Sequence, residues 1–188
     1  MSPTASPDTA YVEQISPGSG RRVAPRAHLR TTAPVIDLCG DWRFRLYPSA
    51  GEADAAASDP GYDDSDWDTI DVPSHWVLRG DGRWGRPAYT NVKYPFPLDP
   101  PHVPDANPTG DHRRRLDVPA DWLASGRVWL RFDGLESLGR VWLNGDEVGI
   151  VRGSRLRQEL DVTDSVRAGE NVLVVRVHQW SAMSYIED

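Results

Sequence analysis

The stretch that decides the fold is Val128–Val151, VWLRFDGLESLGRVWLNGDEVGIV, near the middle of the second half of the chain. Val128–Phe132, Arg140–Leu143 and Glu147–Val151 are short apolar runs of strand length, rich in β-branched and aromatic residues. Asn144-Gly145 separates the last two runs, and this dipeptide suits a type I′ turn, in which both central residues have positive φ. The stretch therefore predicts a β-hairpin preceded by a further strand.

The same strand patterns continue on both sides of this stretch. Asp41–Tyr47 alternates strictly, with Trp42, Phe44 and Leu46 on one face of the predicted strand. Short strands separated by turn signals, without alternating helices, are typical of antiparallel sandwiches. We therefore expect an all-β fold, either an antiparallel β-sandwich or a jelly roll, with Trp42, Trp129 and Trp142 in its core. The remaining predicted strands are Thr69–Val72, Asp111–Val118, Leu156–Val162 and Asn171–His178.

The segments outside the strands carry few regular patterns. Residues 1–34 are rich in Pro, Ser, Thr, Ala and Arg, and we expect an extended N-terminal arm there, with the folded domain at 35–188. Residues 95–110 hold six prolines, so they must run over the surface or line a site. Single helical turns are expected at Glu52–Ala57 and Thr163–Gly169.

Composition excludes several classes of protein. The chain has 188 residues, 16 Gly, 16 Pro, 8 Trp and a formal net charge of −7. An acidic chain is a poor partner for nucleic acid, and no run of about 18 apolar residues suggests a membrane helix. One cysteine, Cys39, rules out an internal disulfide framework. The N-terminus lacks the pattern of a signal peptide, so a cytoplasmic location is expected.

Motifs of common enzymes are absent from the sequence. It holds no G-x-S-x-G, Walker A, Rossmann or H-E-x-x-H pattern, and its five histidines do not form metal-ligand pairs. His178 ends an apolar strand and is expected to be a structural hydrogen-bonding residue. The basic run Arg113–Arg115 is expected to form a solvated strand edge.

Two segments combine side chains that suit a sugar. They are PAYTNVKYPF (87–96) and Asn107–Gly110. An asparagine amide both donates and accepts hydrogen bonds, as paired sugar hydroxyls require, and Tyr89, Tyr94 and Phe96 could contact the apolar face of a pyranose. On composition alone, the alternative is that Asn91 satisfies loop backbone groups and that the aromatic residues are core.

Taken together, these segments resemble the N-terminal domain of bacterial β-galactosidases of glycoside hydrolase family 2. The resemblance covers residues 35–188, and the leader at 11–28 is also similar to that of the family. The pairing of YTN-V-x-YP with NPTG is characteristic of the β-galactosidase branch. The matching segments are LCGDWRF (38–44), VPSHW (72–76), YTNVKYPF (89–96), PPHVPDANPTG (100–110), FDGLES (132–137), VWLNGDEVG (141–149), GSRL (153–156), RAGENVLVV (167–175) and QWSAMSYIED (179–188).

The resemblance implies a galactose-binding-domain-like jelly roll that packs against a catalytic (β/α)₈ barrel. Family members hydrolyse terminal non-reducing β-D-galactose residues, as in lactose, with retention and two glutamates on the barrel. Neither glutamate has a counterpart here, so no catalytic residue is assigned and the chain alone is expected to be inactive. Asn91 matches the family residue that hydrogen-bonds galactose and is the predicted substrate-binding residue.

The resemblance also bears on metals and assembly. Mg²⁺ and Na⁺ are expected in the complete family enzyme, which is expected to be a homo-oligomer, but no metal is assigned to this chain. Asp188 matches an acid that neighbours the family's sodium-binding aspartate. Two departures are Ala182, where the family has Asp, and Cys39, where Asn is usual and a buried thiol is expected here.

Two other functions remain compatible with the sequence. The tryptophan content and the sandwich fold also suit a free-standing carbohydrate-binding module. A third possibility is an interaction domain that docks on a separately encoded barrel subunit. Measurable binding of galactose by the chain alone would favour the module, and an adjacent gene encoding the barrel would favour the docking subunit.

Overall fold

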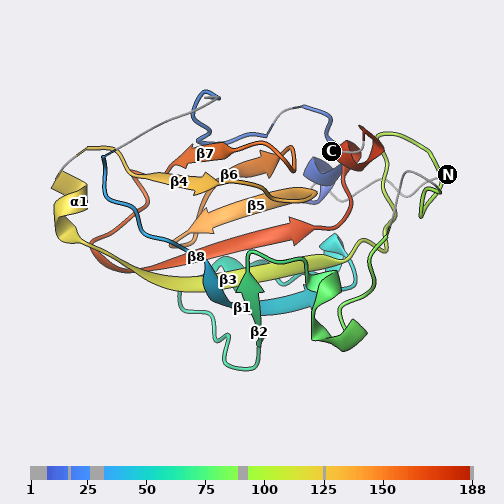
Figure 1. Cartoon of the computed structure of the whole chain (residues 1–188), viewed down its shortest axis with the longest axis horizontal. Coiled ribbons are helices and arrows are strands. Elements are labelled where there is room, and N and C mark those ends of the chain that lie inside the picture. The colour runs from blue at the N-terminus through green and yellow to red at the C-terminus, as the bar shows by residue number, and fades with distance from the viewer. Residues whose placement is uncertain (1–7, 17, 26–31, 89–92, 125, 187–188) are drawn as a thin grey trace.

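The computed structural model describes residues 8–16, 18–25, 32–88, 93–124 and 126–186. These residues form an antiparallel β-sandwich with short 3₁₀ helices and one short α-helix, α1 (Ala120–Ala124) (Figure 1). The strands are β1 (Gly40–Tyr47), β2 (Asp68–Val72), β3 (Thr109–Val118), β4 (Trp129–Phe132), β5 (Leu138–Leu143), β6 (Asp146–Arg152), β7 (Gln158–Asp161) and β8 (Gly169–His178). The 3₁₀ helices are η1 (Ala10–Glu13), η2 (Ala50–Glu52), η3 (Ala55–Ser58), η4 (Trp76–Leu78), η5 (Gly80–Gly82) and η6 (Ala182–Ile186).

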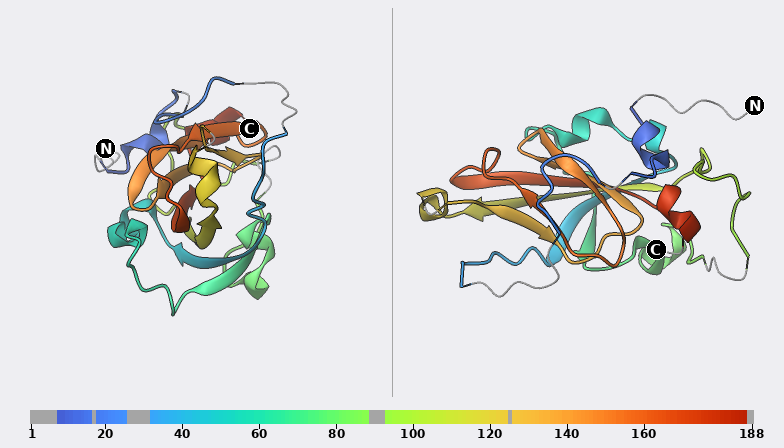
Figure 2. Two further views of the ribbon diagram at one scale, coloured as in Figure 1. Left: turned by 90° about the vertical axis from the view of Figure 1, so that its left-hand side faces the viewer. Right: turned by 90° about the horizontal axis from the view of Figure 1, so that it is seen from above.

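Two antiparallel sheets enclose the main core. The larger sheet has the strand order β2-β1-β3-β8-β5-β6, and β4 pairs with β7 in the smaller one. Figure 1 shows the smaller sheet lying beside β5 and β6, and Figure 2 shows the two layers from the side. The all-β jelly-roll prediction is confirmed, and each predicted strand is present with small differences at its ends.

The alternation of β1 explains the core. Trp42 and Phe44 point inward and are buried, as are Val141 on β5 and Val175 on β8, and Leu160 of β7 closes the cluster from the other sheet. Burial of one such side chain contributes roughly 1.5–3 kcal/mol. Trp76 begins η4 and Trp84 lies in the turn after η5, yet both are buried in the same core as the strand residues.

The β5–β6 hairpin has the turn that its sequence predicts. Asn144 has φ 56° and Gly145 has φ 90°, as a type I′ turn requires. The Asn144 side chain then fixes the hairpin to β8. Its Oδ1 accepts from the backbone N–H of Val172 at 3.0 Å, and its Nδ2 donates to Asn171 Oδ1 at 2.7 Å.

The N-terminal arm runs across the edges of both sheets. Backbone hydrogen bonds join Ser19 to Ile150 in both directions, at 3.1 and 3.0 Å, and the N–H of Arg21 donates to Val148 on the same strand, β6. The N–H of Val23 then donates to Glu159 on β7 at 2.9 Å. The arm therefore covers two strand edges that would otherwise expose unpaired backbone groups.

The outer face of the larger sheet carries buried charge. Arg113 is fully buried beneath the segment that follows β1: its Nε donates to Asp64 at 2.9 Å and its Nη1 donates to the Ala57 carbonyl at 3.1 Å. The prediction of a solvated strand edge at Arg113–Arg115 is wrong, because β3 lies between β1 and β8. Of this run, Arg115 is exposed.

Other expectations also differ from the structure. Trp129 is 38 % exposed, because Leu130 and Phe132 are the residues of β4 that face the core. Cys39 is exposed rather than buried. The expected helical turn at Thr163–Gly169 is instead a hydrogen-bonded turn at 163–165 that leads into β8. In it, the N–H groups of Ser165 and Val166 both donate to the Val162 carbonyl.

The helical content before β2 was only partly anticipated. The single turn expected at Glu52–Ala57 is replaced by two 3₁₀ helices, η2 and η3. Asp54 caps η3, since its side chain accepts from the Ala56 N–H at 2.9 Å. The helix α1 was not predicted.

Candidate functional site

An aromatic cluster occupies one end of the sandwich, where the segment before β3 meets the segment after β8. The rings of Tyr94 and Tyr185 are stacked, with centroids 5.6 Å apart and planes at 10°. Phe96 meets Tyr94, Tyr185 and Trp180 edge-on, with centroid distances of 5.5, 5.7 and 5.2 Å. We call Tyr94, Phe96, Trp180 and Tyr185 the aromatic cluster.

Polar groups hold the two segments together. The Asn107 amide donates to the Trp180 carbonyl at 2.8 Å, and its oxygen accepts from the Trp180 N–H at 2.9 Å. The Gln179 N–H donates to the Pro108 carbonyl at 3.0 Å, and the Tyr94 hydroxyl donates to the Ser184 carbonyl. Asn107 is 2 % exposed, so its amide binds backbone groups and is not available to sugar hydroxyls.

The predicted substrate-binding residue, Asn91, lies outside the described residues, as do Tyr89 and Asp188. The structure therefore places only the neighbours of Asn91 in sequence. Tyr94 and Phe96, predicted from the same motif, do come together in the aromatic cluster. The role of Asn91 stays a prediction.

A buried histidine lies beneath this end of the molecule. His178 is fully buried, with its Nε2 2.6 Å from the Tyr11 hydroxyl and its Nδ1 2.9 Å from Thr109 Oγ1. Burial, together with the positive charges of Arg176 and Arg140, lowers the pKa of His178 to about 3. The histidine is therefore neutral, and its predicted structural role is confirmed.

Two members of the aromatic cluster were not predicted as site residues. Trp180 and Tyr185 belong to QWSAMSYIED, which follows the last strand. Their contacts with Tyr94 and Phe96 span more than 80 positions of sequence, as the Tyr94–Ser184 hydrogen bond shows. Both segments are visibly rich in aromatic residues in the sequence. The local sequence pattern, however, does not predict that two segments so far apart in the chain lie side by side.

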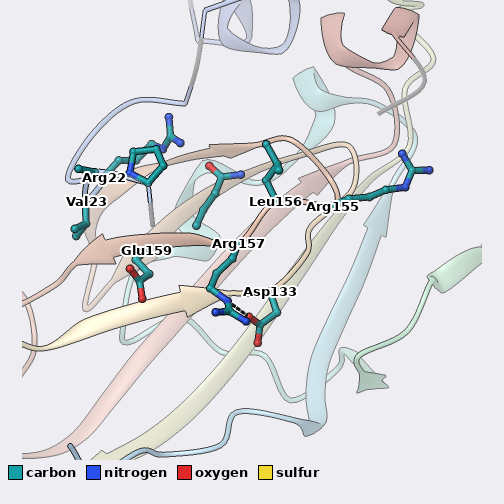
Figure 3. Close-up of a pocket in the computed structure, with 10 residues that line it drawn as sticks. Arg22, Val23, Asp133, Arg155, Leu156, Arg157 and Glu159 are labelled. Atoms are coloured by element: carbon teal, nitrogen blue, oxygen red, sulfur yellow. Dashed lines mark hydrogen bonds and ion pairs between the residues drawn. The ribbon is translucent and has the colours of Figure 1, made fainter. Parts of the chain in front are cut away.

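A concave region lies elsewhere, between the arm and β7 (Figure 3). Its walls are largely charged, and Arg157 Nε donates to Asp133 Oδ1 there at 2.7 Å. The described residues that line it include no aromatic side chain. A sugar ring would find hydrogen-bonding groups but no aromatic surface, so the aromatic cluster is the better candidate site.

The described part of the chain brings together no group of three or more His, Cys, Asp or Glu side chains that could hold a metal ion. The Mg²⁺ and Na⁺ expected for a complete family enzyme stay a prediction, and no step below depends on either ion. Among the described residues, none of the helices has the length and hydropathy that a membrane span requires.

Relatives were found by comparison with known proteins. The chain is 55 % identical over 194 residues to a β-galactosidase of Arthrobacter sp. (strain B7), covering 96 % of this chain and 19 % of the relative. It is 38 % identical to a β-galactosidase of Kluyveromyces lactis, covering 89 % of this chain and 16 % of that protein. The chain thus spans about a fifth or less of the length of these relatives.

Solved structures share the fold. A Bifidobacterium dentium β-glucuronidase matches with a TM-score of 0.56 and 27 % identity, covering 75 % of this chain and 19 % of that one. A Faecalibacterium prausnitzii β-glucuronidase matches with a TM-score of 0.57 and 24 % identity, covering 81 % and 22 %. At that identity the second match supports the fold alone.

The family model for the sugar binding domain of glycosyl hydrolases family 2 matches residues 35–188. The matched region contains both sheets, the aromatic cluster and the loops that carry it. The chain therefore belongs to glycosyl hydrolase family 2, as a sugar-binding domain of that family.

Proposed function

We propose that this chain is the N-terminal domain of a β-galactosidase and forms one wall of its galactose subsite. The observation that carries the proposal is the aromatic cluster at the end of the sandwich. Two of its members, Tyr94 and Phe96, follow the YTN segment closely in sequence. The 55 % identity to a β-galactosidase supports this choice of sugar. Asn91 would donate to and accept from galactose hydroxyls.

In this proposal the chemistry belongs to a catalytic barrel. A retaining glycosidase needs two carboxyl groups about 5–5.5 Å apart, one of which acts as nucleophile and the other as acid and base. Near the aromatic cluster, the carboxylate of Glu13 is engaged by His102 and by the Val103 N–H. The domain would hold the sugar of a β-galactoside such as lactose against a barrel that supplies both glutamates, within a homo-oligomeric enzyme.

Two measurements on the purified chain separate the proposed role from that of a free-standing carbohydrate-binding module. No turnover of a chromogenic β-galactoside is expected, and calorimetry with galactose is expected to show no measurable heat of binding. Turnover by a homogeneous sample would overturn the assignment of the glutamates to the barrel. Clear calorimetric binding would instead identify a free-standing carbohydrate-binding module.

The role of Asn91 is tested in an assembled enzyme. A chimera would carry this chain in place of the corresponding region of the Arthrobacter relative, to which it is 55 % identical. Asn91→Ala is expected to lower kcat/KM by about 30- to 1000-fold, equivalent to ~2–4 kcal/mol, if its hydrogen bonds tighten in the transition state. Lys93→Ala, at an exposed position of the same segment, is the matched control. An unchanged kcat/KM for Asn91→Ala would reject the role.

A further inference from the structure

One carboxylate, that of Glu13, joins the N-terminal arm to the proline-rich segment 95–110. Glu13, the last residue of η1, accepts from the Val103 N–H at 3.1 Å with Oε1. Its Oε2 lies 3.1 Å from Nδ1 of His102. The side chain of Glu13 is 22 % exposed and that of His102 is 52 % exposed, so solvent only partly screens the pair. Both hydrogen bonds fix residues 102 and 103 relative to the arm.

Apolar packing acts at the same place. Val103 packs against a small buried cluster formed by Tyr11 and Val12 of the arm with Leu138 and Ile150 of the larger sheet. The contact seats Val103 on the arm and on the sheet at once. The position of the 99–103 turn is therefore set by the arm from two sides, through Glu13 and through this cluster.

The turn is in direct contact with the aromatic cluster. The Tyr185 hydroxyl donates to the His102 carbonyl, and the Asp99 N–H donates to the same hydroxyl at 3.4 Å. The Tyr185 ring in turn stacks on Tyr94. Figures 1 and 2 show η1 and η6 at the same end of the sandwich. A continuous path of contacts therefore runs from Glu13 through His102 to Tyr185 and Tyr94.

We propose that Glu13 is a positioning residue for the aromatic cluster, and that protonation of His102 tightens its hold on the 99–103 turn. The proposed effect of Glu13 on the orientation of Tyr185 rests only on the contacts described above, from Glu13 to the 99–103 turn and from this turn to Tyr185. The effect on sugar binding rests on the function proposed above. The arm would thus act as a proton-sensitive latch on one wall of the site.

The direction of the pH effect follows from the charges around His102. The pKa of His102 is raised, first by its hydrogen bond to Glu13 and by the charge of Glu13, with a further contribution from Asp99. A raised pKa means that the charged pair is complete below the ordinary value and is lost as the pH rises through the raised value. The latch is therefore tight in mildly acidic solution and loosens above the pKa of His102.

The test follows the NMR signals of His102, Tyr185 and Tyr94 as a function of pH in the purified chain. In the wild type, the His102 signals should titrate above the ordinary pH range of histidine, and the ring signals of Tyr185 and Tyr94 should shift with the same midpoint. Glu13→Gln keeps an oxygen acceptor but removes the charge, so it should lower the midpoint of His102 and uncouple the tyrosine signals from pH. Glu13→Ala removes both hydrogen bonds and should shift the tyrosine signals at every pH.

Glu170→Gln is the matched control, because Glu170 pairs with Arg115 on the exposed surface far along the sheet. It should leave the His102 and tyrosine signals unchanged. Tyrosine signals that stay the same in both Glu13 variants would overturn the proposal. Glu13→Gln, as the conservative substitution, gives that answer even if Glu13→Ala loosens the whole arm.

Galactose at high concentration supplies the second readout, since NMR detects affinities too weak for calorimetry. Glu13→Ala should weaken galactose binding by about fivefold, as expected for the loss of a charge-assisted hydrogen bond that orders a site. Unchanged affinity alongside shifted tyrosine signals would refute the link between the latch and the sugar. Absence of any galactose-dependent shift in the wild type would count against the proposed subsite. The tyrosine signals would still show whether Glu13 positions the aromatic cluster.

Discussion

Arg176 and Asp111 face each other on neighbouring strands and form a bidentate ion pair in the interior. Arg176 Nε donates to Asp111 Oδ1 at 2.7 Å, and Nη2 donates to Oδ2 at 2.8 Å. The two residues are register partners of β8 and β3, and they are 7 % and 0 % exposed. Arg176 Nη2 also donates to the Asp54 carbonyl at 2.6 Å, so this pair fastens the segment after β1 onto the sheet.

Removal of one partner of this pair should be costly. Asp111→Ala would leave the Arg176 guanidinium buried without its counter-charge, which typically destabilises a protein by about 3–5 kcal/mol. We expect a fall of that size in the free energy of unfolding, measured by urea denaturation. The control Glu170→Gln breaks the exposed Arg115–Glu170 pair and should cost less than about 1 kcal/mol. A similar small loss for both variants would show that the buried pair is dispensable.

Two histidines, the fully buried His178 and the half-buried His112, should make the protein less stable as the pH falls. Burial lowers the pKa of His178 to about 3 and that of His112 to about 4. Below the unfolded-state value near 6.5, the unfolded chain takes up protons that the folded protein does not, so stability falls with pH. Each histidine contributes ~1.4 kcal/mol per pH unit to this loss once the unfolded state is protonated.

The window between about pH 6 and pH 5 shows this effect best. Carboxylates titrate mostly below it, and His102, whose pKa is raised, is largely protonated in both the folded and the unfolded state there. Urea denaturation at several pH values should show the slope, and His112→Asn should reduce it by about half. Gly51→Ala, which removes no titratable group and adds a Cβ that meets nothing within 4 Å, is the control and should leave the slope unchanged. A free energy of unfolding that does not vary in this window would contradict the prediction.

The elements set by local sequence could be predicted. Alternation in Asp41–Tyr47 and the Asn144-Gly145 turn depend on residues adjacent in the chain, and both match the structure. The predictions that were wrong concern side chains whose burial depends on where their strand lies in the sheet. Arg113 is buried because β3 is an interior strand under a long covering segment, and Trp129 is exposed because β4 turns its other face to the core.

The site could be predicted only in part, for the same physical reason. Tyr94 and Phe96 were identified from their own motif, but Tyr185 and Trp180 reach them from the other end of the domain. Asn107 has the chemistry of a sugar ligand, and only the fold shows that the backbone of Trp180 uses both ends of its amide. Local patterns name candidate groups, whereas long-range packing decides which of them remain available.

Asn107 should therefore act on the site through structure. Asn107→Ala removes two hydrogen bonds and leaves the backbone N–H and carbonyl of Trp180 without that partner, which should cost about 1–3 kcal/mol of stability. Hydrogen exchange at the Trp180 amide should accelerate in the variant. Asp105→Ala, which changes an exposed side chain of the same segment, should have neither effect. Full stability of Asn107→Ala would return Asn107 to the candidate sugar ligands.

The close approach of the arm to β6 depends on two glycines. Gly20 has φ 85°, and a Cβ built there would lie 2.4 Å from the Cα of Gly149 and 2.7 Å from the Val148 carbonyl oxygen. The methyl group of Gly20→Ala would clash with the backbone of β6, and only movement of the backbone can relieve the clash. The substitution must therefore push the arm away from the strand edge. The freed arm should expose the peptide bonds after Arg21 and Arg22, and we expect trypsin to cut there about tenfold faster under native conditions. Gly51→Ala is the control, because a Cβ at Gly51 meets nothing within 4 Å. Trypsin should cleave this variant at the same rate as the wild type. Equal rates for Gly20→Ala and the wild type would show that the close approach at Gly20 is not needed to keep the arm on the strand edge.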